Sequence, residues 1–327
     1  MDKKRHRPFS KRAKIKNRGC SQKLQRAVCD LGADSSFEQT TKKLQEHYGV
    51  ELCIETVRKV TEKHAKRALE FNWKKKGHSV TAKQLIAEDD GSMVPIVEIL
   101  KGTGDARKRR VLSWKEYRLA AIQKAGEIGW LYAVAYGSVN AVGDSLAIIS
   151  ERAGFGEKTE VHGLGDGAIW VREQMERVFG CQLKFLIDFF HLCDYLSAAG
   201  DIFGEGKAAW MEKTKDDLKK GQIENILKEL KQHEERSPDC KELKDCIRYI
   251  ENRESQFAYD EALAKGLPIG SGKIESSHRN IIQQRMKKPG AWWKTDLAES
   301  MINLRALRAN GDWNKFWEEE TYKGMAA

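Results

Sequence analysis

The sequence predicts an α/β fold in which a mixed sheet carries helices on its faces. Strand-like and helix-like segments alternate between residues 81 and 188, whereas residues 189–263 contain charged amphipathic helices and no strand signal. Membrane-spanning classes are excluded, because no apolar run approaches the roughly 20 residues that a bilayer crossing needs.

Three short extended segments open the predicted sheet. Leu85–Asp90 and Met93–Leu100 are interrupted by Gly91, which predicts a hairpin. Trp114–Gln123 predicts the third strand, after the charged loop at residues 101–110.

Two further strands alternate with two helices. A helix is predicted near Ala141–Arg152, followed by a strand at Glu160–Gly165, a helix at Ala168–Phe179 and a buried strand at Leu183–Ile187. The order of three strands, helix, strand, helix and strand matches the ribonuclease-H-like arrangement. Residues 81–188 are therefore predicted to form the first part of such a domain.

The rest of the chain is predicted to be helical. Residues 189–263 form an all-helical insertion, and residues 264–327 complete the domain with C-terminal helices. One of these helices follows a glycine-rich break and carries Ile274 and His278, and the last spans Asp296–Ala309.

Residues 35–80 are predicted to hold two short helices. Phe37, Leu44 and Tyr48 recur at helical spacing in the first helix, which Gly49 ends. The second buries a stripe that includes His64, and its other face carries Arg58, Lys59, Lys63, Lys66 and Arg67. A basic second helix is typical of a helix-turn-helix that reads DNA. A plain helical hairpin with solvated lysines is the alternative, and Glu51 and Glu55 favour it.

The net charge of +10 is concentrated at the N-terminus. Residues 1–26 hold eleven Lys or Arg against Asp2 alone, so the other residues are neutral as a group. A basic arm, taken as residues 1–34, is the pattern of a segment that binds a polyanion such as DNA. A solvated tail that keeps the protein soluble is the alternative.

The seven cysteines are odd in number, scattered and never spaced C-x-x-C. This pattern disfavours a disulfide framework and a structural zinc site. It favours the reducing cytoplasm, and the N-terminus shows no apolar signal core.

Three acids occupy positions suited to metal-dependent catalysis. Asp90 ends the first predicted strand, Asp166 ends the fourth, and Glu275 lies in the first turn of the helix after the insertion. Three converging carboxylates can hold two Mg²⁺ or Mn²⁺ ions, which would clamp the attacking and leaving oxygens of a displacement at phosphorus. Acids that merely form turns before glycine are the alternative.

Five ordered motifs carry a family resemblance: Ala87–Pro95, Trp114–Leu119, Leu164–Trp170, Phe185–Leu192 and Gly270–Ser276. With them the chain resembles, from about residue 20 to residue 317, the bacterial insertion-sequence transposases of the ISKra type, Mutator-related members of the DDE group. The resemblance implies that Asp90, Asp166 and Glu275 are the catalytic acids. Strand alternation points the neighbouring Asp89 to the opposite side of the sheet.

The resemblance also implies the activity and the partners. Such an enzyme binds the terminal inverted repeats of its element, cleaves the DNA and joins the 3′-hydroxyl to target DNA, as a dimer or higher oligomer associated with the bacterial nucleoid. Asp188 and His191 match a further element of related enzymes and are expected to orient phosphates or to tune the ions. A half-buried His supported by Asp is the alternative for that pair.

A segment near the C-terminus combines basic and aromatic residues, a pattern that favours contact with DNA. The residues predicted to make this contact are Arg285, Lys287, Lys288 and Trp292. Packing in the core is the alternative for the tryptophan. Two other functions remain open from the sequence: a catalytically inactive DNA-binding regulator derived from a transposase, and a metal-dependent structure-specific nuclease.

Overall fold

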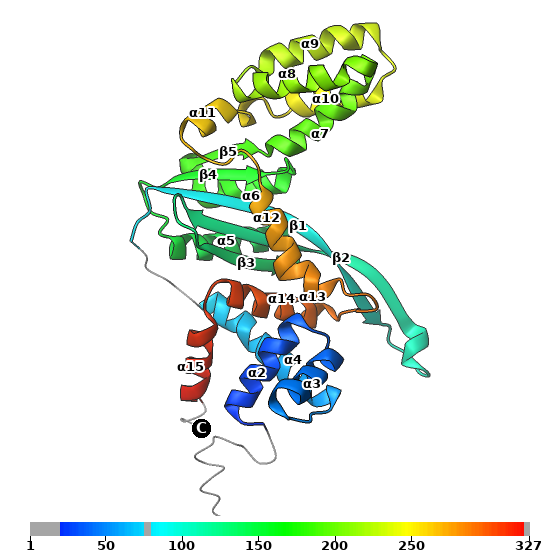
Figure 1. Cartoon of the computed structure of the whole chain (residues 1–327), viewed down its shortest axis with the longest axis vertical. Coiled ribbons are helices and arrows are strands. Elements are labelled where there is room, and N and C mark those ends of the chain that lie inside the picture. Colours follow the sequence, from blue (N-terminus) through cyan, green and yellow to red (C-terminus); the bar gives the residue numbers. More distant parts are fainter. Residues whose placement is uncertain (1–19, 75–79, 324–327) are drawn as a thin grey trace, which may run out of the picture.

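The structure is a computed structural model that describes residues 20–74 and 80–323. The molecule is elongated, with a helical lobe at one end, the sheet in the middle and the N-terminal helices at the other end (Figure 1). Residues 1–19, which hold most of the predicted basic arm, lie outside the described residues. No helix in the described part is long and apolar enough to span a membrane.

The sheet has five strands in the order β3-β2-β1-β4-β5. The strands are β1 (Gln84–Ile99), β2 (Arg110–Lys124), β3 (Trp130–Tyr136), β4 (Glu160–Gly165) and β5 (Leu183–Ile187). Strand β2 is antiparallel to both of its neighbours, β1 and β3, whereas β4 and β5 run parallel to β1. The predicted mixed α/β sheet is therefore confirmed.

Two details of the predicted strands are wrong. Gly91 is not a turn, because it lies inside the continuous strand β1 and pairs with Arg118. A Cβ at this position would lie 2.3 Å from the Glu116 Oε1, so the glycine makes room for that side chain. The third strand of the chain is β3, which the prediction missed, because β1 accounts for both of the first two predicted strands.

Helices cover both faces of the sheet (Figure 1). On one face α5 (Val139–Ala153) and α6 (Ile169–Phe179) share a core with Leu85, Ala87 and Ile122. The other face packs against the helical lobe through Ile86, Leu164 and Leu186. Since Leu85 and Ala87 face α5 and α6 while Ile86 faces the lobe, strand β1 alternates as its sequence predicts.

Residues 189–263, all of which the structure describes, contain helices and no strand. The α-helices here are α7 (Phe189–Ala199), α8 (Lys207–Lys219), α9 (Ile223–Arg236), α10 (Lys241–Glu251) and α11 (Tyr259–Ala264). Within this lobe, short 3₁₀ turns lie at Gly200–Gly206 and Glu254–Gln256. Before the lobe, such turns lie at Ala106–Arg109 and Gly180–Gln182.

The N-terminal helices are α2 (Gln22–Asp34), α3 (Phe37–Tyr48) and α4 (Ile54–Lys74). The predicted end of α3 is confirmed, since Gly49 adopts the left-handed conformation with φ 62°. Helix α2 corrects the prediction that the basic arm extends to residue 34. It begins after Ser21, whose side chain accepts a hydrogen bond from the Leu24 N–H, and it buries Val28, Cys29 and Ala33.

The C-terminal segment returns across the sheet to these helices. It comprises α12 (Gly272–Ser277), a π turn (His278–Gln283), α13 (Gln284–Met286), α14 (Thr295–Ala309) and α15 (Trp313–Lys323). Helix α14 is buried on most sides, because it lies between α4 and β3. The N-terminal helices therefore pack on the sheet domain through α14 rather than standing apart from it.

His64 of α4 lies at the junction of three helices. It is 2% exposed, its Nε2 lies 2.8 Å from the Gln25 Oε1 of α2, and its ring centroid lies 4.6 Å from that of Trp317 on α15. Burial first, and then the charges of Lys63 and Arg67, lower its pKa from 6.5 to about 3.

Acidification is expected to destabilise the protein through His64. The folded protein holds the ring neutral at a pH where the unfolded chain protonates it, so the stabilisation is present above pH 6.5 and is lost as pH falls toward about 3. The expected loss at pH 5 is about 2 kcal/mol of unfolding free energy relative to neutral pH. Urea unfolding at both pH values measures it.

The variant His64→Gln should remove that part of the pH dependence. His47→Gln, which changes an exposed histidine of α3, is the matched control and should keep it. An unchanged pH dependence in His64→Gln would contradict the assignment.

Candidate active site

Acidic residues lie at the same level on three neighbouring parallel strands. Asp166 and Asp188 directly follow the ends of β4 and β5, whereas Asp90 lies inside β1, which corrects the prediction that it ends its strand. Glu88 pairs with Leu164, and Leu164 pairs with Leu186. Asp90, Asp166 and Asp188 each follow these three residues by two positions. Since side chains alternate along strands, Asp90 belongs to the face that the helical lobe and α12 cover, while Asp166 and Asp188 lie in the turns that follow β4 and β5.

Asp90 contacts the helix segment that carries the third predicted acid. Its Oδ2 lies 3.2 Å from the His278 Nε2, and its Oδ1 accepts a hydrogen bond from the Gly91 N–H at 2.6 Å. His278 is 3% exposed, whereas the Asp90 side chain is 35% exposed. The Asp90 carboxylate is therefore held from one side and open to solvent from the other.

Helix α12 is attached to β1 one turn earlier. The Ile274 N–H donates to the Glu88 Oε2 at 2.7 Å. Glu275 follows in the first turn of α12 and is exposed. Residues three apart share a helix face, so Glu275 lies on the same side of this segment as His278, which contacts Asp90. Glu275 therefore lies near the acidic stretch Glu88–Asp90 of β1, and its charge acts on Glu88.

Glu88 is a member of the site that the sequence prediction missed. It is 1% exposed, and its pKa is raised to about 7, first by burial and also by Asp188 and Glu275, against the lowering effects of the Ile274 N–H and Lys273. Its place two residues before Asp90 on the same strand was the available signal, because such residues share a face.

Asp89 points to the other side, as alternation predicts. It is 0% exposed, and neither carboxylate oxygen has a hydrogen-bond partner among the described residues. Burial, Asp90 and Glu88 raise its pKa well above the usual range. Asp89 therefore lies buried on the face that α5 and α6 cover, in surroundings that disfavour its charged form.

Asp166 lies in a turn that the helical lobe holds in place. Its Oδ1 accepts from the Ala168 N–H at 2.9 Å, and its main-chain oxygen accepts from the Tyr249 hydroxyl at 2.9 Å. The Arg253 Nη2 donates to the Gly167 oxygen, also at 2.9 Å. Tyr249 lies on α10, and Arg253 follows the end of this helix by two residues. The sequence prediction missed both.

Asp188 has a structural role that differs from the predicted one. It is 3% exposed and caps α7 by accepting from the Phe190 and His191 N–H groups at 2.7 and 2.9 Å. Its other oxygen accepts from the Ser271 Oγ at 2.6 Å and from the Ser271 N–H. With both oxygens occupied, Asp188 positions the loop before α12 instead of orienting phosphates. His191 is half-buried, with its ring centroid 5.6 Å from that of Tyr195.

The carboxylates suit magnesium or manganese by chemistry, since both ions prefer oxygen ligands. Within residues 20–74 and 80–323, no three His, Cys, Asp or Glu side chains lie close enough to hold one ion as they stand. Asp90, Asp166 and Glu275 are each at least partly exposed, so a cation can reach each of them from solvent. These three residues fit a metal site by donor type.

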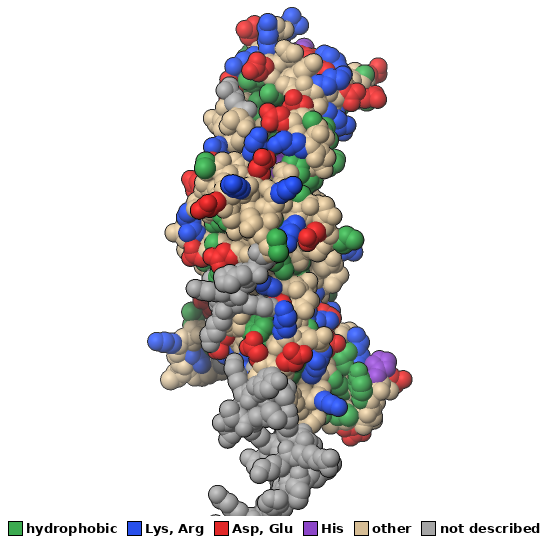
Figure 2. Space-filling view, turned by 90° about the vertical axis from the view of Figure 1, so that its left-hand side faces the viewer, with side chains coloured by type: hydrophobic (Ala, Val, Ile, Leu, Met, Phe, Trp, Pro, Cys, Tyr) green, Lys and Arg blue, Asp and Glu red, His purple; other side chains and the backbone are tan. Residues whose placement is uncertain are grey.

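The predicted DNA-binding residues of α4 differ in their surroundings. Arg58 pairs with Glu55 at 2.7 Å and with Glu62 at 3.0 Å, and Lys59 pairs with Glu55 at 3.3 Å. Lys63 is exposed and Arg67 is half-buried. The acids neutralise much of the charge at the start of α4. On the face shown in Figure 2, Lys and Arg side chains are likewise mixed with Asp and Glu.

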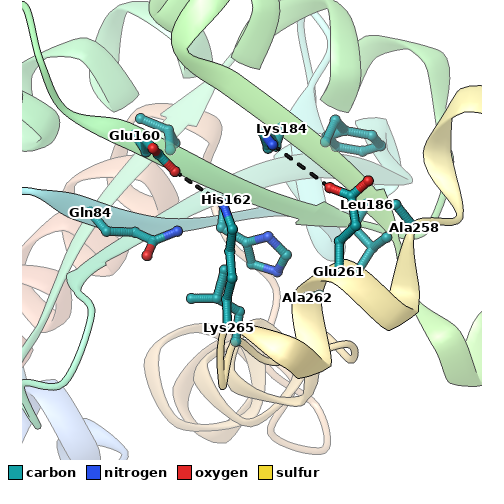
Figure 3. A pocket seen from close by; sticks show the side chains of 12 residues that line it. Gln84, Glu160, His162, Lys184, Leu186, Ala258, Glu261, Ala262 and Lys265 are labelled. Atoms are coloured by element: carbon teal, nitrogen blue, oxygen red, sulfur yellow. Dashed lines mark hydrogen bonds and ion pairs between the residues drawn. The ribbon is translucent and has the colours of Figure 1, made fainter. Parts of the chain in front are cut away.

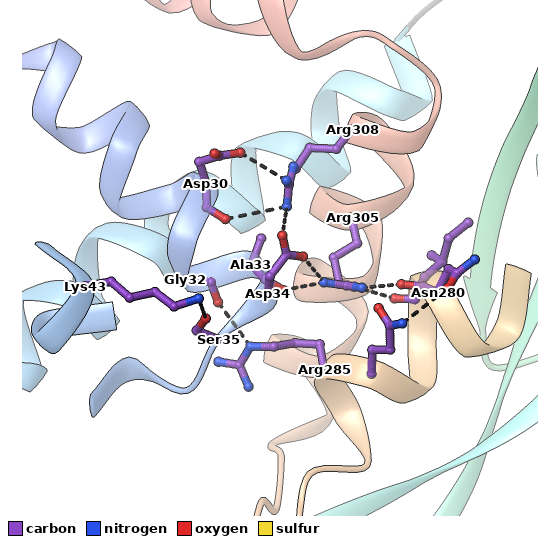
Figure 4. A network of polar contacts seen from close by, with 12 residues as sticks. Asp30, Gly32, Ala33, Asp34, Ser35, Lys43, Asn280, Arg285, Arg305 and Arg308 are labelled. Atoms are coloured by element: carbon purple, nitrogen blue, oxygen red, sulfur yellow. Dashed lines mark hydrogen bonds and ion pairs between the residues drawn. The ribbon is translucent and has the colours of Figure 1, made fainter. Parts of the chain in front are cut away.

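Arg285 is not a surface contact, which corrects that prediction. It is 3% exposed, its Nε donates to the Gly32 oxygen at 3.0 Å, and its guanidinium lies 4.9 and 4.7 Å from the ring centroids of Phe37 and Trp293. It joins α13 to the N-terminal helices (Figure 4).

The other residues predicted in this segment remain at the surface. Lys287 is exposed, Lys288 is half-buried and Trp292 is 41% exposed. The ring centroid of Trp292 lies 6.4 Å from that of Trp114 on β2.

A small pocket lies at the opposite end of β4 and belongs to a different region (Figure 3). Two ion pairs cross it, Lys265–Glu160 at 3.3 Å and Lys184–Glu261 at 3.7 Å. The His162 Nε2 is bound to the Pro268 oxygen at 2.7 Å. Because it lies at the start of β4, whereas Asp166 follows the end of that strand, this pocket is not part of the acidic site.

Comparison with known proteins places the chain in a family without assigning an activity. No curated protein matches the sequence. A family model matches residues 16–321, which include every strand and all helices up to most of α15. The chain therefore belongs to UPF0236, an uncharacterised protein family.

Proposed function

We propose that this protein is a DDE transposase of the ISKra type that cleaves DNA and joins a 3′-hydroxyl to target DNA, with Asp90, Asp166 and Glu275 as catalytic acids. One observation carries the proposal. The segment that carries Glu275 is attached to β1 through Glu88 and through the His278–Asp90 contact, and Asp166 directly follows the neighbouring strand β4, which supports a shared site for the three acids. The strand order and directions support the ribonuclease-H-like arrangement.

Asp90, Asp166 and Glu275 would hold two divalent cations, Mg²⁺ or Mn²⁺. When bound, such ions activate the attacking oxygen and stabilise the leaving oxygen of a phosphodiester. The surrounding residues hold the acids in position. His278 orients Asp90, Tyr249 and Arg253 hold the turn that contains Asp166, and Asp188 fixes the loop before α12.

For the recognition of element ends we propose helices α3 and α4 with the basic N-terminal segment. The pair of helices around Gly49 supports a helix-turn-helix, and Lys63 remains exposed on the second helix. Insertion joins two element ends, so we propose that the protein acts as a dimer or higher oligomer on DNA.

A catalytically inactive DNA-binding regulator is the second candidate. Such a protein would need the exposed Lys63 and the basic N-terminal segment for DNA binding but none of the three acids. A metal-dependent nuclease without strand transfer would use the same acids.

One assay separates the three functions. The protein is incubated with labelled duplexes taken from the DNA that flanks its coding region, a target plasmid and Mg²⁺ or Mn²⁺. We expect joined products that EDTA abolishes. Nicked DNA alone would identify a nuclease, a shifted but intact probe would identify a regulator, and no binding to any duplex would overturn all three.

A further inference from the structure

Strands β1 and β2 continue well beyond the sheet as a two-stranded ribbon, which Trp293 flanks near its base through a bridge to Ile96. Strand β4 pairs with β1 only as far as Glu88, and β3 pairs with β2 only as far as Tyr117. Pairing between β1 and β2 goes on to Ile99 and Arg110. The ribbon is therefore on the order of 25 Å long. It projects from the body of the molecule in Figure 1.

The tip of the ribbon carries uncompensated positive charge. Residues 101–110 hold five Lys or Arg against Asp105 alone, in a chain whose residues after 26 are neutral as a group. Arg109 closes the loop, since its Nη1 donates to the Leu100 oxygen at 2.7 Å. The other four cations are exposed and form no ion pair with any residue that the structure describes: Lys101, Arg107, Lys108 and Arg110.

One face of the ribbon is apolar and exposed. Met93, Ile99, Leu112 and Trp114 share this face by strand alternation, and they are 44%, 46%, 52% and 55% exposed. The opposite face is covered near its base, where Val94 and Ile96 join a buried core. The exposed face therefore lies beside the charged tip.

We propose that this ribbon, residues 92–117, is an arm that lies in a groove of duplex DNA. The four tip cations would contact phosphates, and the apolar face would contact base edges. The major groove is wide enough for a two-stranded ribbon, and T methyl groups offer apolar contacts there. A second copy of the chain is a poorer occupant, because two tips of the same sign repel each other.

The inference rests on the proposed function for the identity of the partner, but it concerns binding rather than cleavage. Its test is therefore made in EDTA with a labelled duplex of about 30 base pairs and fluorescence anisotropy. The arm variant combines Lys101→Gln, Arg107→Gln, Lys108→Gln and Arg110→Gln. Its matched control removes four exposed lysines of the helical lobe: Lys215→Gln, Lys220→Gln, Lys241→Gln and Lys244→Gln.

The arm variant should bind duplex DNA more weakly by on the order of tenfold or more. The slope of log K against log salt should fall by about 0.9 for each phosphate that the variant no longer neutralises. The control should lose much less affinity. Equal losses in both variants, or an unchanged affinity in the arm variant, would overturn the inference.

A second variant shortens the arm without changing the hydrogen-bonded pairing of β1 with β2. Replacing residues 101–108 by Asn-Gly joins Leu100 to Arg109, whose backbones already pair through the Leu100 N–H and the Arg109 oxygen at 2.9 Å. It should also bind DNA more weakly. Wild-type affinity combined with a smaller sedimentation coefficient than the wild type would instead assign the ribbon to contact between copies and overturn the inference.

The two proposals fail in different ways. If both arm variants bind normally while the wild type cleaves and joins DNA, the arm is wrong and the proposed function stands. If the arm variants lose affinity while the wild type neither cleaves nor joins DNA, the arm stands and the proposed function is wrong.

Discussion

Replacing Asp166 with Asn is expected to abolish DNA cleavage, with a loss on the order of 10³-fold, and to leave DNA binding intact. The carboxylate is partly exposed and accepts a single hydrogen bond, from the Ala168 N–H at 2.9 Å. The Asn oxygen can accept the same bond, so the turn should keep its shape. What the variant loses is the negative charge that a divalent cation needs.

The same result is expected for Asp90→Asn and for Glu275→Gln. Both side chains are at least partly exposed, so the loss of charge should cost little folding stability. Asp144→Asn is the matched control. Asp144 is an exposed acid of α5, on the opposite face of the sheet, where it pairs with Arg177 at 2.8 Å.

The measurement uses a labelled element-end duplex with Mg²⁺ for cleavage and the same duplex in EDTA for binding. Cleavage by any of the three variants at the wild-type rate would remove that residue from the catalytic set. Loss of cleavage in Asp144→Asn would show that the assay reports general damage to the protein.

The alternation of side chains along β1 could be predicted from the sequence. It distinguished Asp90, the candidate catalytic acid, from the adjacent Asp89. Asp90 faces the site, and Asp89 is buried on the other side of the sheet. The continuity of this strand through Gly91 could not be predicted. It depends on pairing with Arg118 and on the space that Glu116 occupies, and both lie on a strand that is distant in sequence.

Strand β3 and helix α2 were missed for a related reason. Trp130–Tyr136 owes its burial to α5 and α14, and Gln22–Asp34 owes its burial to α4 and the C-terminal helices. The basic residues before and within α2 dominate the local composition, and they favoured a basic arm. Neither partner helix is visible in the local pattern of these segments.

The residues of the site likewise divide into those that the sequence could predict and those that it could not. Asp166 and Glu275 stand at the ends of elements, as predicted, whereas Asp90 lies inside the continuous strand β1. Tyr249 reaches the Asp166 turn from a helix 83 residues away, so no local spacing could reveal it. Arg285 lies among aromatic residues that suggest nucleic-acid contact, but its partner is the Gly32 oxygen, 253 residues earlier.

Replacing Arg305 with Ala is expected to lower the free energy of unfolding by about 3 kcal/mol. Arg305 lies on α14 and is 7% exposed. Its Nε donates to the Ile281 oxygen at 2.7 Å, and its Nη1 donates to the Ala33 oxygen at 2.6 Å and to the Asp34 carboxylate (Figure 4). The alanine variant would leave buried carbonyl groups without donors, and each such group costs about 1–3 kcal/mol.

The matched control is Arg308→Ala, one turn along the same helix. Arg308 is 28% exposed and pairs with Asp30 at 3.1 Å and Asp34 at 2.9 Å. Because solvent screens these pairs, the expected loss is about 1 kcal/mol or less. Urea unfolding of both variants measures the difference, and equal losses would contradict a special role for the buried guanidinium.

The consequence of Arg305→Ala should extend to the acidic site. The Arg305 guanidinium also donates to the Asn280 oxygen, so it holds the π turn His278–Gln283 from behind. His278 at the start of that turn contacts Asp90. A looser turn should therefore raise the Mg²⁺ concentration needed for half-maximal cleavage, whereas Arg308→Ala should leave it unchanged. An unaltered metal requirement in a destabilised Arg305→Ala protein would limit this residue to joining the N-terminal helices to α14.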